Sequence, residues 1–238
     1  MLERKILMII IYDFDGTITP YPQPKYEVFN VCNVNEDIIV RDAKEVMDKK
    51  KVSLYEAYFI IYRRYLKENN LLYNKDTVCL GADKVTLNKG VLEYLAELNS
   101  NKTSLKHYIV TAGFKEYILE TPVFKYIDGV YGSTFKVKNG LYDEIDILMN
   151  DREKIEAIKE ICNINKKDVK DVVYIGDGLT DKDAFEYVHN NGGKSILLSD
   201  SKDSKEYEYF SNLGIIDECF KLDYSIGSSL YNYISKLN

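Results

Sequence analysis

The chain has 238 residues, of which 45% are hydrophobic and 29% charged, and its formal net charge is −6. This composition is typical of a globular protein with a sizeable core, and the length suits one large domain or one domain with an insertion. The acidic balance argues against the basic footprint of a nucleic-acid-binding protein. The longest apolar run near the N-terminus, residues 6–12, is too short to cross a membrane and lacks a following signal-peptide cleavage site. We therefore expect a cytoplasmic protein with no nucleic-acid or membrane partner.

The N-terminal third of the chain changes character twice. Residues 6–12 are rich in β-branched side chains and bounded by turn residues, which predicts a buried strand. Three of the four prolines lie within residues 19–24, which predicts an extended connector because proline fixes φ and removes a hydrogen-bond donor. The segment that follows has helical periodicity, most clearly in residues 52–69, where Ser53 and Glu56 have the spacing of a capping box.

From about residue 81 onward, strand and helix patterns alternate. The Asn139-Gly140 pair within residues 130–145 predicts a β-hairpin. The other expected strands are 107–111, 172–175 and 194–198, and the expected helices are 90–98, 115–119, 152–162 and 181–188. Such alternation predicts an α/β fold with a doubly wound, mainly parallel sheet covered on both faces. The helical block interrupts it, so we expect a core of residues 1–20 and 82–238 and an inserted helical cap of residues 21–81.

Several conspicuous side chains are expected to be structural. The tyrosines on one stripe of the helix at 52–69 should pack inside the cap, and the arginines beside them should be exposed. The cysteines form no CxxC pair and no metal-ligand spacing, so we expect reduced thiols. Neither histidine has a partner in the sequence that would suggest catalysis. These residues are Tyr55, Tyr58, Tyr62, Tyr65, Arg63, Arg64, Cys32, Cys79, Cys162, Cys219, His107 and His189.

Polar residues follow three of the predicted strands. Asp13 and Asp15 follow the first strand, Thr111 ends a second, and Asp177 and Asp181 follow a third. In open parallel sheets ligands bind beyond the carboxyl ends of the strands, so these residues are expected to meet at one site. Four carboxylates at short range cannot all stay ionised alone, and a hard divalent cation such as Mg²⁺, often shared with a substrate phosphate, resolves this.

The residues at these strand ends carry a family resemblance. The runs Asp13-Phe14-Asp15-Gly16-Thr17 and Gly176-Asp177-Gly178-Leu179-Thr180-Asp181, with Thr111 after a hydrophobic strand, resemble the motifs of the haloacid dehalogenase superfamily of phosphohydrolases. Lys154 lies where that family has a conserved lysine. The resemblance spans residues 6 to about 198, and the insertion after the first motif resembles a C1-type cap of the phosphoserine-phosphatase-like branch. The resemblance implies a Rossmann-like core and a small phosphorylated metabolite as substrate.

The resemblance also implies roles for individual residues. Asp13 would attack phosphorus and form an aspartyl-phosphate. Asp15 would protonate the leaving oxygen and then activate water. Thr111, the backbone of Ala112 and Gly113, and Lys154 would bind the phosphoryl group. Mg²⁺ would be held by the Asp13 carboxylate, the Asp15 backbone carbonyl and Asp177, and Asp181 would bind the metal or hold one of its ligands. Asp181 is also a possible N-cap of the following helix.

One position departs from the pattern of the phosphoserine phosphatases. That branch places a glutamate nine positions after the nucleophile, where it meets the substrate amine, and this chain has Pro22 there. The nearest acid, Glu27, is out of register. Tyr21 and Tyr26 offer rings and hydroxyls suited to a neutral polar or aromatic leaving group. We therefore expect L-phosphoserine to be a poor substrate.

Three other functions are alternatives to a phosphatase. A phosphomutase or phosphotransferase would pass the phosphoryl group to another hydroxyl, and the motifs do not separate that from hydrolysis. A non-enzymatic phosphoacceptor domain would use neither the acid Asp15 nor the cap. A true dehalogenase needs neither Mg²⁺ nor a second aspartate two residues after the nucleophile. The sequence identifies neither the substrate nor the oligomeric state.

Overall fold

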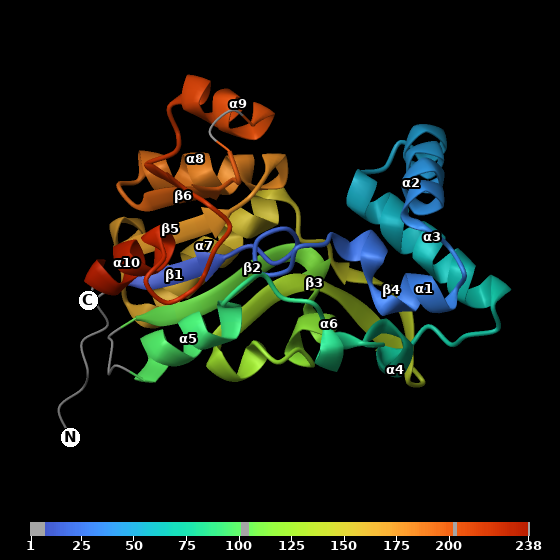
Figure 1. Cartoon of the computed structure of the whole chain (residues 1–238). Helices are drawn as coiled ribbons and strands as arrows, with labels where there is room; N and C mark the ends of the chain where they lie inside the picture. Colours follow the sequence, from blue (N-terminus) through green and yellow to red (C-terminus); the bar gives the residue numbers. More distant parts are fainter. Residues whose placement is uncertain (1–7, 101–104, 202–203, 238) are drawn as a thin grey trace.

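The computed structural model of the chain, which describes residues 8–100, 105–201 and 204–237, contains a seven-stranded sheet (Figure 1). The strand order is β4-β3-β2-β1-β5-β6-β7, and only the β3–β4 pair is antiparallel. The strands are β1 (Ile9–Tyr12), β2 (Lys106–Phe114), β3 (Gly129–Lys138), β4 (Leu141–Ile147), β5 (Val172–Gly176), β6 (Lys194–Leu198) and β7 (Glu218–Phe220). The expected mainly parallel α/β sheet is confirmed.

The central strand shows why the sheet is covered on both faces. All of β1 is buried, and its alternate side chains belong to different hydrophobic clusters. Ile9 and Ile11 pack with the helices of one face, and Ile10 and Tyr12 with those of the other. The first group of helices is α7 (Asp151–Asn165), α8 (Lys182–Asn190) and α9 (Lys205–Leu213), and the second includes α5 (Val91–Ser100) and α10 (Ser229–Ile234).

The register of the central strands brings the predicted site together. Tyr12 pairs with Ile109 of β2 on one side and with Ile175 of β5 on the other. The carboxyl ends of β1 and β5 and the last part of β2 therefore lie at one edge of the sheet. This edge carries Asp13, Thr111 and Asp177.

Residues 21–81 form four helices beyond this edge of the sheet (Figure 1). They are α1 (Glu27–Val31), α2 (Glu36–Lys50), α3 (Leu54–Glu68) and α4 (Lys75–Val78). The predicted capping box at the start of α3 is present. Phe59 of α3 packs on Phe114 of β2 and Phe135 of β3, with ring centroids 5.0 and 5.5 Å apart. The block is thus seated on the ends of β2 and β3.

The structure confirms some of the other predictions from the sequence and contains elements that were not predicted. The hairpin is confirmed, with positive φ at Asn139 (52°) and Gly140 (77°) as a tight turn requires. Residues 6 and 7 of the first predicted strand lie outside the described residues. Three elements after residue 198, namely α9, β7 and α10, were not predicted from the sequence. Arg63 and Arg64 are exposed and none of the four cysteines forms a disulfide, as expected.

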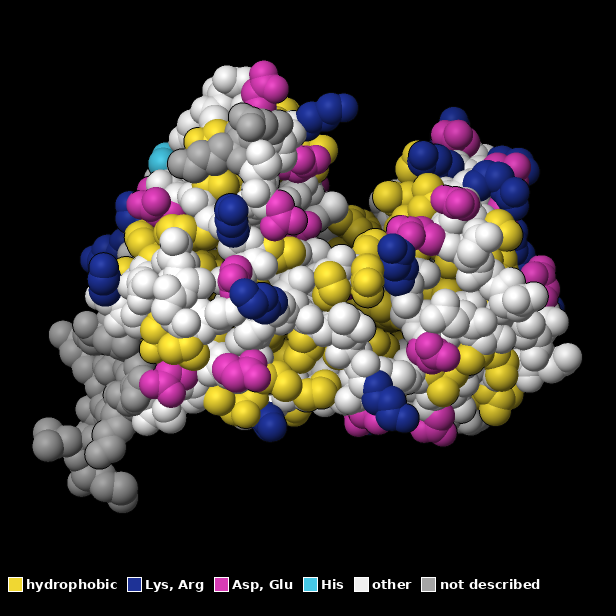
Figure 2. All heavy atoms as spheres, viewed as in Figure 1, with side chains coloured by type: hydrophobic (Ala, Val, Ile, Leu, Met, Phe, Trp, Pro, Cys, Tyr) yellow, Lys and Arg dark blue, Asp and Glu magenta, His cyan; other side chains and the backbone are white. Residues whose placement is uncertain are grey.

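The surface is hollowed between the helical block and the part of the molecule that carries α8 and α9, and hydrophobic side chains gather in this hollow (Figure 2). On the face shown, basic and acidic side chains are interspersed. Within the described residues, no helix combines the length and the apolar character that a membrane crossing needs.

Candidate active site

Asp13 follows β1 directly and lies almost entirely inside the protein, with 4% of its surface exposed. Its backbone N–H donates to the carbonyl of Ile175, at 2.9 Å, which extends the pairing with β5 by one residue. The ammonium of Lys154 donates to Asp13 Oδ1 at 3.1 Å. Burial raises the pKa of Asp13, and the positive charge of Lys154 opposes that rise. The pKa of Asp13 is still raised, to about 7, so the lysine offsets only part of the effect of burial.

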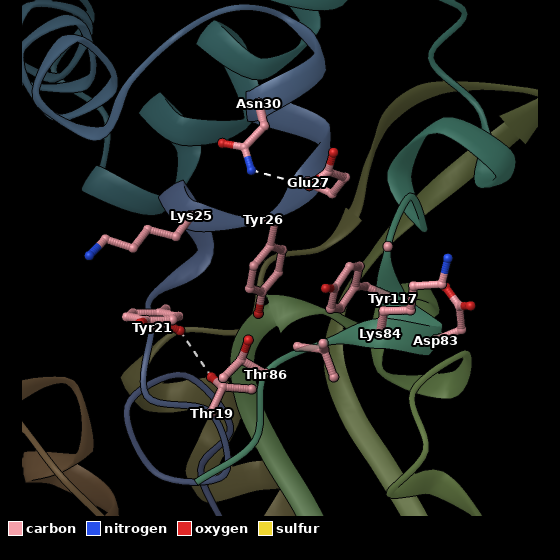
Figure 3. Close-up of a pocket in the computed structure, with 12 residues that line it drawn as sticks. Thr19, Tyr21, Lys25, Tyr26, Glu27, Asn30, Asp83, Lys84, Thr86 and Tyr117 are labelled. Carbon is pink, nitrogen blue, oxygen red and sulfur yellow. Dashed lines mark hydrogen bonds between the residues drawn. The ribbon is translucent and has the colours of Figure 1, made fainter.

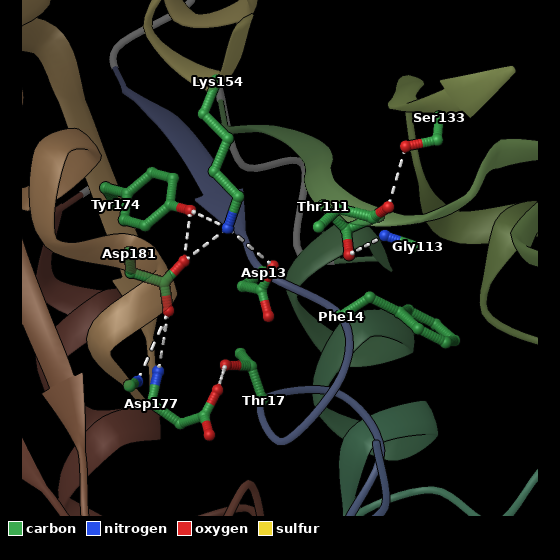
Figure 4. Close-up of polar contacts among 12 residues, drawn as sticks. Asp13, Phe14, Thr17, Thr111, Gly113, Ser133, Lys154, Tyr174, Asp177 and Asp181 are labelled. Atoms are coloured by element: carbon green, nitrogen blue, oxygen red, sulfur yellow. Dashed lines mark hydrogen bonds and ion pairs between the residues drawn. The ribbon is translucent and has the colours of Figure 1, made fainter. Parts of the chain in front are cut away.

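Lys154 is held in a network of three side chains (Figure 4). It reaches in from α7 with 1% of its surface exposed and also donates to Asp181 Oδ1 at 2.7 Å. The Tyr174 hydroxyl donates to the same oxygen at 2.7 Å. The pKa of Lys154 is raised well above its ordinary value, because Asp13 and Asp181 outweigh the opposing effect of burial. Lys154 is thus a fixed, permanently charged group beside Asp13.

Asp181 is fully buried, and both of its oxygens are engaged by the protein. Besides Lys154 and Tyr174 on Oδ1, the backbone N–H groups of Asp177 and Gly178 donate to Oδ2 at 3.3 and 3.4 Å. Asp181 occupies the N-cap position of α8, as expected, but its side chain makes no capping hydrogen bond to that helix. The carboxylate instead ties the loop after β5 to Lys154.

Asp177 is the first residue of the loop that follows β5. It accepts a hydrogen bond from the Thr17 hydroxyl at 3.0 Å through Oδ1. A Cβ added at Gly16, whose φ is +86°, would lie only 2.2 Å from the other oxygen, so only a glycine there allows the carboxylate to approach. Burial, followed by the charges of Asp181 and Asp13, raises the pKa of Asp177.

These carboxylates form a site that fits a hard divalent cation. Ligand oxygens of Asp13, Asp177 and Asp181 all lie within 4.8 Å of one another. Burial raises the pKa values of Asp13 and Asp177, and the positive charge of a metal would favour their ionised forms. Because Asp181 already accepts bonds at both oxygens, Asp13 and Asp177 are better placed to bind the metal directly.

Asp15 and the irregular last part of β2, residues 111–113, line a cavity of about 200 Å³ together with Asp13. Burial raises the pKa of Asp15 to about 7. Thr111 is buried, and its Oγ1 accepts a hydrogen bond from the Gly113 backbone at 3.2 Å. The Ser133 hydroxyl of β3 donates to the Ala112 carbonyl at 2.8 Å and holds this part of β2 in place (Figure 4). The cavity thus has a hydroxyl and a stretch of backbone beside two carboxyl groups.

The opposite wall of the cavity comes from the helical block and is free of charged side chains. It consists of Pro22, Gln23, Pro24, Leu54, Tyr55 and Tyr58, joined by Thr180 from the loop after β5. The expectation for the tyrosine stripe is therefore only half right. Tyr62 and Tyr65 are buried in the block, whereas Tyr55 and Tyr58 face the cavity.

The structure brings all of the predicted site residues to this one edge of the sheet, but two neighbouring predictions are wrong. Tyr21 lines a different cavity, and the Tyr26 hydroxyl bonds to Asp15 instead of facing the leaving-group space. No role was predicted for Thr17, Ser133 or Tyr174. Thr17 is the last residue of the first motif and Tyr174 shortly precedes the last motif, so position in the sequence is the only signal for these two residues.

A mainly parallel sheet with an acidic, oxygen-lined centre at its carboxyl edge and a helical insertion above it defines a class of α/β enzymes. The chain belongs to the haloacid dehalogenase-like hydrolase family, whose match covers residues 10–186. The expectation of an enzyme of that superfamily is confirmed.

Similar solved structures share the fold. A phospho-aspartyl intermediate analogue of a phosphoserine phosphatase is 20% identical, with a TM-score of 0.65 over 97% of this chain and 99% of that one. A substrate-bound phosphoserine phosphatase complex is 19% identical, with a TM-score of 0.65 over 97% and 98%. A hydrolase of the same family from Salmonella enterica serovar Typhi is 16% identical, with a TM-score of 0.66 over 94% and 70%. The phosphoserine-phosphatase-like fold is thus confirmed.

Among curated proteins, an uncharacterized protein of Borreliella burgdorferi is 23% identical to this chain. The match covers 98% of this chain and 97% of that protein. The similarity therefore extends over both the sheet and the helical block.

Proposed function

We propose that the chain is a magnesium-dependent phosphomonoesterase that hydrolyses a small phosphorylated metabolite of the cytoplasm through an aspartyl-phosphate on Asp13. One observation carries the proposal. The Asp13 carboxylate lies at a small cavity that Thr111, Ala112 and Gly113 also line, and a permanently charged ammonium lies 3.1 Å from one of its oxygens. Such an arrangement suits a nucleophile that attacks an anionic phosphoryl group.

The residues divide the reaction between them. Asp13 attacks phosphorus, and Asp15 gives a proton to the leaving oxygen as the P–O bond breaks. Lys154, the Thr111 hydroxyl and the backbone N–H groups of Ala112 and Gly113 balance the charge of the phosphoryl oxygens. Asp15 then takes a proton from water as the water attacks phosphorus, which releases inorganic phosphate and restores Asp13.

The metal would be held by the Asp13 carboxylate, the Asp15 backbone carbonyl and Asp177. When bound, it supplies positive charge to the phosphoryl oxygens and orients them for in-line attack. Asp181 would keep the Asp177 loop and Lys154 in place, since both its oxygens are already engaged.

The cavity favours a small leaving group without a positive charge. Pro22 lines it at the position where a phosphoserine phosphatase is expected to carry an acid. Glu27, the nearest acid in sequence, lines a separate cavity and accepts a hydrogen bond from Asn30. An ammonium group bound at the uncharged wall would be buried without a partner, which is costly. L-phosphoserine is therefore proposed as a poor substrate.

The helical block of residues 21–81 is proposed to act as a cap that closes over this cavity. Two contacts of Tyr55 support the idea, because it faces the cavity from α3 and lies beside Thr180 of the core. Burial raises the pKa of Tyr55 to about 12. Closure of this kind shields a reacting phosphoryl group from solvent.

Purified protein assayed with p-nitrophenyl phosphate tests the function. Release of phosphate should require Mg²⁺ and should stop in excess EDTA. A panel of sugar, nucleotide and alcohol phosphates should then give higher kcat/KM values than L-phosphoserine. Undiminished turnover in EDTA would contradict the metal, and a tenfold advantage for phosphoserine would contradict the substrate class.

A further inference from the structure

The carboxyl group of Asp15 is held from the root of the helical block. The Tyr26 hydroxyl donates a hydrogen bond to Asp15 Oδ1. The backbone N–H of Gln23 also donates to this carboxyl group. Gln23 belongs to the proline-rich connector and Tyr26 directly precedes α1, so the acid of the core takes its orientation from the start of the helical block.

Tyr26 is itself rigidly placed. It is 4% exposed, and its ring stacks on Tyr117 of α6 (Lys115–Leu119) with centroids 4.2 Å apart and planes at 9°. The two rings face each other across the edge of a cavity of about 720 Å³ at the base of α1 (Figure 3). Asp15 lines the smaller catalytic cavity and Tyr26 lines the larger one, so the Tyr26 ring stands between them.

The second oxygen of Asp15 has different surroundings. A Cβ built on Gly113 would lie 3.2 Å from Asp15 Oδ2 and 3.5 Å from Thr111 Oγ1. Oδ2 therefore faces the backbone of Gly113, in the part of β2 that is proposed to bind phosphate. Tyr26 holds one oxygen of the carboxyl group while the other is turned toward the place where the leaving oxygen would sit.

We propose that Tyr26 is a positioning residue for Asp15: by holding Oδ1, its hydroxyl places the catalytic proton on Oδ2 and aims it at the leaving group. The inference rests on the proposed phosphatase function and deepens it. It also makes the helical block a part of the acid–base machinery, because a shift of its root would release the Asp15 carboxyl group.

This geometry determines where the proton goes in each of the two steps of the reaction. In the first step a bond forms between an Asp13 oxygen and phosphorus, the P–O bond to the leaving group breaks, and its oxygen takes the proton from Asp15 Oδ2. In the second step the oxygen of water attacks phosphorus, its proton returns to Asp15 Oδ2, and the Asp13–phosphorus bond breaks. Tyr26 keeps its own proton throughout and donates to Oδ1 in both charge states of Asp15.

A purely structural role for Tyr26 makes a different prediction. If the ring only packs against Tyr117, Tyr26→Phe keeps the packing, and all substrates should respond alike. If the hydroxyl aims the acid, the response should depend on how much help the leaving group needs. An alkoxide must be protonated as it departs, whereas p-nitrophenolate departs without a proton.

The experiment compares kcat/KM for an alkyl phosphate and for p-nitrophenyl phosphate, because kcat/KM reports the steps up to departure of the leaving group. Tyr26→Phe should lower the alkyl value about tenfold or more and the aryl value less than about threefold, since a misaimed acid loses part of its catalytic contribution. Tyr21→Phe, which removes an exposed hydroxyl from the same connector, is the matched control and should leave both values unchanged.

A double-mutant cycle gives the second readout. In an Asp15→Asn background the acid is absent, so adding Tyr26→Phe should lower kcat/KM for the alkyl phosphate no further. Equal losses for both substrates, or full additivity with Asp15→Asn, would overturn the inference. If the wild-type protein hydrolysed neither substrate with Mg²⁺, the proposed function itself would fail, which is a separate result.

Discussion

The two walls of the catalytic cavity are built on opposite principles. The floor is Asp13 together with the network behind it, which is formed by Lys154, Tyr174, Asp177 and Asp181. Apart from the partly exposed Asp177 these side chains are buried, and hydrogen bonds hold them in place. The roof, formed by Pro22, Pro24, Leu54, Tyr55 and Tyr58, has no charged side chain, and Leu54 is 39% exposed. The floor is suited to a single reaction, and the roof can select a substrate only by shape and weak contacts.

The physical reason for the difference is the cost of burying charge. An ammonium such as that of Lys154 is stable inside a protein only when carboxylates accept from it in good geometry. Each floor residue therefore depends on the others, and a change in one should spread through the network. Roof side chains make no such network, so changes there should stay local.

The largest effect is expected at the nucleophile. Asp13→Asn is nearly isosteric but cannot attack phosphorus, so kcat should fall by more than about a thousandfold. Steady-state kinetics measures the loss, and thermal unfolding checks that the fold persists. Activity near that of the wild type, with deamidation excluded by mass spectrometry, would show that the floor has been assigned to the wrong residue.

The next effect concerns stability. Lys154→Met leaves Asp13 and Asp181 buried without their cation, and the free energy of unfolding in urea should drop by about 3–5 kcal/mol in Mg²⁺-free buffer. Lys159→Met, on the same helix but half exposed, is the control and should cost less than about 1 kcal/mol. Equal costs for the two variants would mean that the floor is not an interdependent network.

Asp181 tests how the floor supports the metal. Asp181→Asn should weaken activation by Mg²⁺ about tenfold to a hundredfold, because residues that hold the ligands have effects of this size. A titration of activity against Mg²⁺ gives the value. Loss of all metal response, as great as that of Asp177→Asn, would instead make Asp181 a direct ligand.

The smallest effect is expected at the roof. Tyr58→Ala removes part of one apolar wall, so KM for a preferred substrate should rise about fivefold while kcat changes little. Leu72→Ala, an exposed apolar residue of the same helical block, should change neither parameter. A large fall in kcat with Tyr58→Ala would show that the roof takes part in the chemistry.

The sequence predicted the floor far better than the roof. Asp13, Thr111 and Asp177 follow buried strands, and the order of parallel strands brings such positions together whatever lies between them in the sequence. Lys154 could be placed only by family resemblance, because its own helix looks like an ordinary amphipathic one.

Contacts between the helical block and the core have no comparable signal in the sequence. Tyr26 bonds to Asp15 across the proline-rich connector, and no periodicity in the sequence predicts that contact. The tyrosine stripe of α3 spans both the interior and the cavity, so its spacing could not tell Tyr58 from Tyr62. The short C-terminal strand β7 and the helices α9 and α10 lacked a repeat long enough to detect.

The most direct test of the account is to trap the covalent intermediate. Protein mixed with a radiolabelled phosphomonoester and Mg²⁺, quenched in acid within one turnover and digested, should carry the label on the peptide that contains Asp13. The label should be absent from Asp13→Asn. Turnover without a labelled peptide, or a label on another residue, would contradict the assignment of Asp13 as the nucleophile.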